Sequence, residues 1–235
     1  SAIFCEKPLG IDITQSRELV ALVNNAGTPA GVNFVFSAAP SATKMSEIVG
    51  QPEFGKIIRC DLDLHFQDWP RPWHVNAQWL RDRDQGGWVR EVVSHFLFII
   101  NRSLGTTSVN DVLISYPDGP EGKLAETDLL ASLDSGGKPL AIKGTSGGAG
   151  PDIVNLTIRG TNSAVRIWDW YRLQVCEDGD WRDLLGTDRA ELGMNAYVDQ
   201  LDQLALMIEG ETSLIASFDE ALAVQEIVEE ILSSQ

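Results

Sequence analysis

The sequence is short of cysteine and histidine. It has 3 Cys and 3 His in 235 residues, and no Cys-x-x-Cys pair occurs. A zinc ribbon and a disulfide framework are therefore unsupported, and the spacing of His65 and His74 fits no standard metal site. The three widely separated cysteines indicate reduced, mostly buried thiols, which is the expectation for a cytoplasmic protein.

Positive charge is also scarce. The chain has 18 Lys and Arg against 34 Asp and Glu, a formal net charge of −16. Nucleic-acid-binding proteins usually carry a basic surface, so neither nucleic acid nor an anionic membrane is an expected partner. The longest apolar run lies in residues 95–100, far below the roughly 18 residues needed to span a bilayer.

The dinucleotide-binding motif Gly-x-Gly-x-x-Gly is missing as well. The glycine-rich stretch 144–150 lacks that spacing and lies between two predicted strands. A phosphate-binding turn that leads onto a helix is not expected there. We predict instead that this stretch is a mobile hairpin loop.

The first 36 residues have the pattern of a strand, a helix and a second strand. An apolar run at 2–5 is followed by a helical stretch to about residue 26 and by a nearly continuous apolar run at 31–36. The helix is predicted to begin at Asp12 or Thr14 and to bury Leu19, Leu22 and Val23. Apolar runs of this kind are typical of a parallel sheet covered on both faces. Because such units usually occur in series, we expect the chain to begin inside a domain.

A different pattern follows. In residues 57–66 apolar side chains alternate with polar ones, which predicts a half-buried strand of an antiparallel or mixed sheet. Further strands are predicted at 109–116, 126–134, 138–143, 152–160 and 163–175. Helices are predicted at 41–50, 88–103, 191–208 and 218–232. The helix at 191–208 carries Tyr197, Val198, Leu201, Leu204, Ala205 and Ile208 on one face.

The helix at 88–103 contains a candidate acid–base pair. Glu91 and His95 are four residues apart, so they share a helical face and can touch. A carboxylate at one imidazole nitrogen raises the basicity of the other, as in a general acid–base histidine. A plain surface pair is the alternative, but the helix is apolar nearly all round, and unpaired charges on a buried helix are costly.

Lys7 is a second candidate. Pro8 holds it in an extended conformation, and the bond between them is one of the few that can be cis. Lys7 follows a predicted parallel strand, and ligands of open α/β sheets bind at the carboxyl ends of strands. Partial burial would lower the pKa of Lys7 and let it exchange a proton. The alternative is a solvated lysine in a turn.

The stretch FCEKPLG (4–10), followed by a glycine pair and by Glu91 and His95, resembles the Gfo/Idh/MocA family of oxidoreductases along nearly the whole chain. The resemblance implies an α/β (α+β) fold. Residues 1–38 would be the C-terminal remnant of a Rossmann domain that binds NAD or NADP. Residues 39–235 would form the substrate-binding and oligomerisation domain, with a large, open, mixed and mainly antiparallel sheet. The implied activity is hydride transfer between the nicotinamide and a CH–OH group of a sugar, polyol or related compound, with this chain a truncated form.

The resemblance also implies roles for single residues. Lys7, in the motif with Glu6 and Pro8, would lie beside the nicotinamide and the reacting carbon. His95 would carry the proton or orient the substrate. Glu91 stands where the family usually has Asp, and would contact the substrate or hold His95.

Other positions match the family less well. Trp79 and Arg81 resemble a Trp-Arg element near the cofactor, although Leu80 intervenes. Ser94 and Phe98 stand where the family often has Gly and an acid. These differences leave the substrate contacts open, and a non-catalytic sugar-sensing or protein-interaction role remains the alternative.

The stretch 66–79 is rich in tryptophan. We expect it, with its polar residues Arg71 and His74, to form a loop that overhangs Lys7 and His95. Trp73 and His74 would be among the residues that bind the substrate, and the flanking polar groups can bind hydroxyls. Tryptophan faces stack well on sugar rings. A packed subunit interface is an equal alternative, and a homodimer or homotetramer formed through the open face of the sheet is expected.

Overall fold

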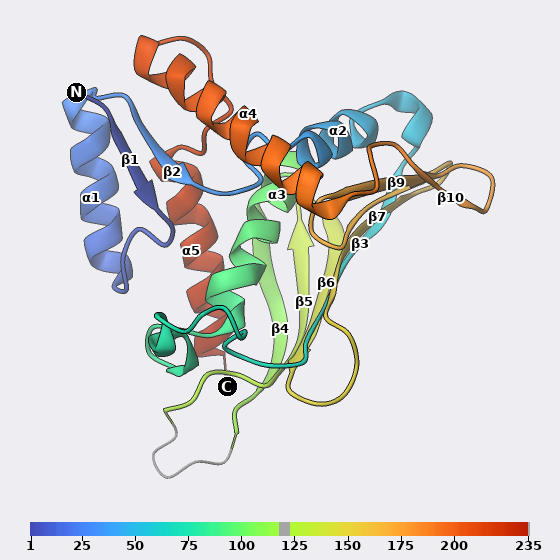
Figure 1. Cartoon of the computed structure of the whole chain (residues 1–235), viewed down its shortest axis with the longest axis horizontal. Helices are drawn as coiled ribbons and strands as arrows, with labels where there is room; N and C mark the ends of the chain where they lie inside the picture. Colours follow the sequence, from blue (N-terminus) through green and yellow to red (C-terminus); the bar gives the residue numbers. More distant parts are fainter. Residues whose placement is uncertain (118–122, 235) are drawn as a thin grey trace.

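The computed structural model describes residues 1–117 and 123–234. The predicted strand–helix–strand unit is present as β1 (Ile3–Glu6), α1 (Ile13–Ala26) and β2 (Ala30–Asn33). The two strands pair in parallel. Asp12 caps α1 by accepting a hydrogen bond from the backbone of Gln15, and Gly27 ends the helix in the left-handed conformation. This unit lies to one side of the molecule (Figure 1).

The predicted buried stripe of α1 is partly wrong. Val23 is buried, but Leu19 and Leu22 are exposed. The buried positions are Ser16, Val20 and Val23, which share one face because an α-helix has 3.6 residues per turn. That face packs against α5 (Phe218–Ser233).

The remaining strands form one eight-stranded sheet in the order β10-β9-β8-β7-β3-β6-β5-β4. Their bounds are Ile57–Phe66 (β3), Thr107–Ser115 (β4), Asp128–Ser135 (β5), Lys138–Ser146 (β6), Ile153–Gly160 (β7), Ala164–Trp168 (β8), Arg172–Cys176 (β9) and Trp181–Asp183 (β10). Only the β3–β6 pair is parallel within this described sheet. The predicted mixed, mainly antiparallel sheet is therefore confirmed. So is the alternation along β3, whose buried face carries Cys60, Leu62, Leu64 and Phe66.

Two predictions about this sheet are corrected. The strand expected at 163–175 is divided into β8 and β9 by a turn in which Asp169 and Trp170 have positive φ angles of 45° and 74°. No glycine or proline marks that turn in the sequence. The glycine-rich stretch 144–150 does not make a hairpin, because β6 and β7 lie on opposite sides of β3 and the connection must cross the end of that strand.

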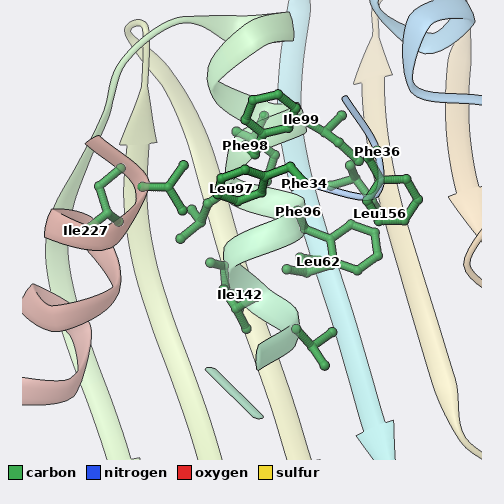
Figure 2. Packing of buried hydrophobic residues seen from close by; sticks show 14 of the residues in the cluster. Phe34, Phe36, Leu62, Phe96, Leu97, Phe98, Ile99, Ile142, Leu156 and Ile227 are labelled. Atoms are coloured by element: carbon green, nitrogen blue, oxygen red, sulfur yellow. The ribbon is translucent and has the colours of Figure 1, made fainter. Parts of the chain in front are cut away.

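Helices cover one face of the sheet (Figure 1). They are α2 (Pro40–Val49), α3 (Ser94–Leu104) and α5, and each contacts strands of the sheet. Figure 2 shows the core between them, where side chains of α3 meet Leu62, Ile142 and Leu156 of the sheet and Ile227 of α5. Phe96, Leu97, Phe98 and Ile99 of α3 are almost fully buried, and each such side chain contributes about 1.5–3 kcal/mol by leaving water. This packing fixes the position of α3, which carries the candidate site.

The predicted helix at 191–208 is present as α4 (Arg189–Glu209). It crosses the top of the molecule in Figure 1, and Gln200 donates a hydrogen bond to the carbonyl of Phe34. Its apolar face is largely exposed, as Met194, Tyr197, Val198, Leu201 and Ile208 show. Across the described ranges, no helix combines the length and the apolar character needed to cross a bilayer.

Candidate functional site

Lys7 lies immediately after β1 and reaches across to the start of the α3 region. Its Nζ donates to Oε2 of Glu91 at 2.6 Å, to the carbonyl of Glu91 at 2.7 Å and to the carbonyl of Arg90 at 3.4 Å. The Lys7 side chain is only 6% exposed, whereas that of Glu91 is 34% exposed. Lys7 is therefore an anchored, nearly buried cation and not a solvated turn lysine. The Lys7–Pro8 bond is cis.

A π-helical segment, Val89–Val93, precedes α3 and presents these carbonyls. Segments of this kind are often found at functional sites. Arg90 fixes the segment from the other side, since its guanidinium forms a two-pronged ion pair with Glu229 at 2.6 and 2.7 Å. It also donates to the carbonyls of Arg83 and Gly86.

The expected contact between Glu91 and His95 is not formed. The wider π-turn changes the register of an i,i+4 pair, and Glu91 bonds to Lys7 instead. No hydrogen bond reaches Nδ1 of His95 in the part of the chain that the structure describes. The hypothesis that Glu91 holds His95 is thus corrected: Glu91 holds Lys7.

His95 lies among aromatic rings. It meets Phe34 and Phe36 edge-on, with ring centroids 5.8 and 6.2 Å away. Burial lowers the pKa of His95 well below its usual value, and the positive charges of Lys7 and Arg71 lower it further. His95 is therefore neutral at neutral pH.

Burial also lowers the pKa of Lys7 from its usual value of 10.5, while the negative charges of Glu91 and Glu6 act in the opposite direction. Glu6 itself is exposed and accepts a hydrogen bond from Asn33. The first two residues of the Glu6-Lys7-Pro8 motif thus differ in exposure: Glu6 is exposed to solvent, whereas the Lys7 side chain is nearly buried at the site.

The tryptophan-rich loop lies close to this pair. Trp69 donates to the carbonyl of Leu80 and packs edge-on against His74, which also contacts Trp73. Burial lowers the pKa of His74, the positive charge of Arg71 lowers it further, and the charges of Glu91 and Lys7 act on it in opposite directions. Trp73 remains 60% exposed.

Trp79 ends the tryptophan-rich stretch 66–79, and Arg81 follows two residues later. Both are exposed on a short 3₁₀ helix, Gln78–Arg81, and Arg81 donates a hydrogen bond to Gln78. The contacts of the described residues join neither of them to Lys7. Their assignment to the cofactor stays a prediction.

Arg71 belongs to the tryptophan-rich stretch, whose polar side chains were predicted to bind hydroxyl groups, and the structure places it among the aromatic rings of that loop. A second site residue, Glu126, was not expected from the sequence. Glu126 is 1% exposed and accepts a 2.7 Å hydrogen bond from the backbone of Val89. Burial raises the pKa of Glu126 to about 7. Nothing in the local sequence distinguishes it from a surface acid.

The chemistry of Lys7 and His95 suits contact with a reacting hydroxyl group. A cationic side chain at the end of a parallel strand, beside a neutral histidine, can face a reacting hydroxyl group. The 235 residues contain no Gly-x-Gly-x-x-Gly turn for a pyrophosphate. Among the described residues, no group of His, Cys, Asp and Glu could hold a metal ion.

No protein-family model matches the sequence, and a search of curated proteins also finds no match. Solved structures do match. An NAD-binding oxidoreductase from Klebsiella pneumoniae is 18% identical, with a TM-score of 0.78 over 100% of this chain and 71% of that one. The dehydrogenase MviM from Clostridium difficile is 14% identical, with a TM-score of 0.76 over 98% of this chain and 70% of that one.

A third similar structure is an oxidoreductase from Agrobacterium radiobacter in complex with NAD⁺, L-tartaric acid and magnesium. It is 16% identical, with a TM-score of 0.73 over 99% of this chain and 71% of that one. The chain therefore has the fold of Gfo/Idh/MocA-type oxidoreductases, as its sequence predicts.

Proposed function

We propose that the protein is an NAD(P)-dependent oxidoreductase acting on a CH–OH group of a sugar, a polyol or a related hydroxy compound. The observation that carries the proposal is the nearly buried Lys7–Glu91 pair at the end of β1, with the neutral His95 close by. Perturbed titratable groups that converge at the end of a parallel strand are typical of catalytic sites. The oxidoreductases that share the fold support the same class of activity.

The nicotinamide, when bound, accepts or donates the hydride. The chain's own residues handle the oxygen and its proton. All three hydrogen bonds of Lys7 Nζ are made within the protein, and the bond to the Arg90 carbonyl is the longest, at 3.4 Å. A substrate oxygen that takes the place of the Arg90 carbonyl as acceptor therefore costs the least free energy. Lys7 then orients the substrate oxygen, while His95 or Lys7 exchanges its proton.

Dinucleotide binding commonly uses a Gly-x-Gly-x-x-Gly turn for the pyrophosphate, and that motif does not occur in this sequence. We therefore propose that the active enzyme includes a nucleotide-binding segment in addition to them, this chain being a shortened form. The matched structures are longer, since the chain covers about 70% of each. NAD and NADP are both compatible with the residues present.

The experiment is to replace Lys7 in the active protein and to measure NAD(P)-dependent oxidation of hydroxy compounds. For Lys7→Met, kcat/KM should fall by roughly 10²- to 10⁴-fold, the usual contribution of a positioned proton-exchanging group. Lys138→Met is a matched control, because Lys138 also donates to two backbone carbonyls but lies at the β5–β6 turn. Equal activity in Lys7→Met and Lys138→Met would refute the role of Lys7.

The second candidate is a non-catalytic sugar-sensing or protein-interaction role. It is favoured by the missing phosphate-binding turn. A protein that binds sugars or polyols tightly but never reduces NAD(P)⁺ with any of them would support this alternative.

We also propose that copies of the protein associate through the open face of the sheet as a homodimer or homotetramer. The strand pairings place Leu113, Leu130, Lys143 and Asp63 in one row across that face. Leu113 and Leu130 are 64% and 51% exposed.

We further propose a cytoplasmic location, which the three free cysteines fit.

A further inference from the structure

Arg71 is a partly buried cation whose donors are unused. Its Nε and Nη2 atoms are buried, and neither has a hydrogen-bond partner in the described part of the chain. A buried donor without a partner costs free energy, more so when it is charged. Burial lowers the pKa of Arg71 to about 10, so the side chain still carries its charge at neutral pH.

The two unused donors have a specific geometry. Nε and Nη2 lie on the same edge of the planar guanidinium group. A carboxylate can accept two parallel hydrogen bonds along such an edge, and this bidentate pairing is among the strongest that arginine forms. The free donors of Arg71 therefore match a planar anion with two oxygens.

The surroundings favour a carboxylate over a phosphate. The guanidinium carbon lies 4.5 Å from the ring centre of Phe66, 4.7 Å from Trp170, 5.3 Å from Trp73 and 5.7 Å from Trp69. These aromatic walls offer few further donors, whereas a phosphate carries more charge and more acceptor oxygens to satisfy. The positive charge of Arg189 also acts on Arg71, but Arg189 is paired with Asp169 at 3.2 Å. Arg71 is thus the cation with unused donors between these rings, which suits a monoanion on a molecule with apolar or sugar-like faces.

The protein's own carboxylates near Arg71 make no hydrogen bond to it in the described part of the chain. The negative charges of Asp152 and Glu91 both act on Arg71. Asp152 accepts a hydrogen bond from the backbone of Gln67, and Glu91 is held by Lys7. Neither carboxylate supplies the missing partner for Nε and Nη2.

Arg71 borders the proposed catalytic residues. It stacks on Trp170, which packs against Phe96 of α3, the residue next to His95. Its charge also acts on His95 and on His74. An anion held by Arg71 would therefore lie against the rings of Trp73 and Trp170 and within electrostatic range of His95 and His74.

We propose that Arg71 binds the carboxylate of the substrate, so that the preferred substrates are hydroxy acids of the aldonic or uronic acid class and not neutral polyols. The assignment rests on the proposed function of the site. It implies that the substrate carries an anionic group and that Arg71 determines substrate specificity.

Binding measurements test the assignment without requiring turnover. The probes are D-gluconate and D-galacturonate as carboxylates, D-glucitol as the neutral counterpart and D-glucose 6-phosphate as the phosphate, titrated into the purified protein by calorimetry. The wild type should bind at least one of the two acids more tightly than D-glucitol or the phosphate. Arg71→Met should weaken acid binding by roughly 10- to 100-fold, the range for a charged hydrogen-bonded pair, and leave D-glucitol binding unchanged. Arg71→Lys should recover only part of the loss, because lysine lacks the two-donor edge.

Arg166→Met is the matched control, since Arg166 also stacks on a tryptophan ring, at 4.2 Å from Trp181, but lies in β8. It should bind the acids as the wild type does. The assignment is overturned if Arg71→Met binds the acids unchanged, if the phosphate or D-glucitol binds best, or if neither acid binds at millimolar concentration. Acid binding that depends on Arg71 without any hydride transfer would instead refute the proposed oxidoreductase and leave the anion site standing.

Discussion

Glu91 sets the electrostatic environment of Lys7. Burial lowers the pKa of Lys7, and Glu91 is the main group that raises it again. In the Glu91→Gln variant the pKa of Lys7 should therefore fall further. If Lys7 orients the substrate as an ammonium group, the loss of kcat/KM at high pH should begin at a lower pH in Glu91→Gln than in the wild type.

The measurement is the pH profile of kcat/KM for both proteins. Glu226→Gln is the control, since Glu226 also pairs with a basic side chain, Arg17, but on the exposed surface of α1 and α5. Superimposable profiles for Glu91→Gln and the wild type would show that Glu91 does not tune Lys7.

Among single residues, the sequence pointed to those that lie in a motif. Lys7 and His95 were candidates from their positions before a proline and on an apolar helix, and their proposed roles came from the resemblance to the Gfo/Idh/MocA family. Glu126 was not predicted, because its burial and its partner Val89 come from a segment distant in the chain. Arg71 was placed in the tryptophan-rich loop, but the sequence does not show that its Nε and Nη2 atoms are buried without a partner. The predicted contact between Glu91 and His95 was wrong because the observed partner of Glu91, Lys7, is 84 residues away in the sequence.

The start of the α3 region depends on the buried Glu126. Its carboxylate accepts the backbone hydrogen bond of Val89, and a Cβ atom at Gly87 would collide with it. Its pKa is about 7 in the folded protein and 4.5 in its ordinary state. Between these values the folded protein binds more protons than the unfolded one, so stability should fall as the pH rises from 4.5 to 7.

Glu126→Gln keeps an acceptor for Val89 and removes this titration. We expect the free energy of unfolding of the variant to exceed that of the wild type above pH 7 by up to about 3 kcal/mol. The difference should shrink as the pH approaches 4.5. Denaturant unfolding across this range checks it, with Glu191→Gln in the exposed first turn of α4 as control. A pH-independent difference between Glu126→Gln and wild type would contradict the assigned pKa.

Most helices and strands were predictable because their apolar patterns are long and regular. The π-turn at Val89–Val93 and the division between β8 and β9 were not. Both depend on backbone geometry that no glycine or proline at these positions indicates in the sequence. The exposed apolar face of α4 is a further feature that the sequence does not explain. An apolar stripe predicts a helix, but it does not identify what packs against that stripe.

At the scale of the whole molecule, the open sheet face should hold copies of the protein together. Leu130→Asp places a charge in the middle of the row formed by Leu113, Leu130 and Lys143. We expect sedimentation velocity to show a dimer or tetramer for the wild type and a monomer for Leu130→Asp. Ile11→Asp, which changes an exposed residue before α1, should keep the wild-type state. An unchanged assembly in Leu130→Asp would exclude this face.

The most direct test of the account is turnover by the natural protein, purified intact from its source cells. Reduction of NAD⁺ and NADP⁺ is followed by nicotinamide absorbance with a panel of sugars, polyols, aldonic acids and uronic acids. We expect steady hydride transfer from at least one hydroxy compound, by a protein of mass greater than the 25.7 kDa of these 235 residues. A protein that binds members of the panel but reduces neither nucleotide would contradict it and would favour the sensing role.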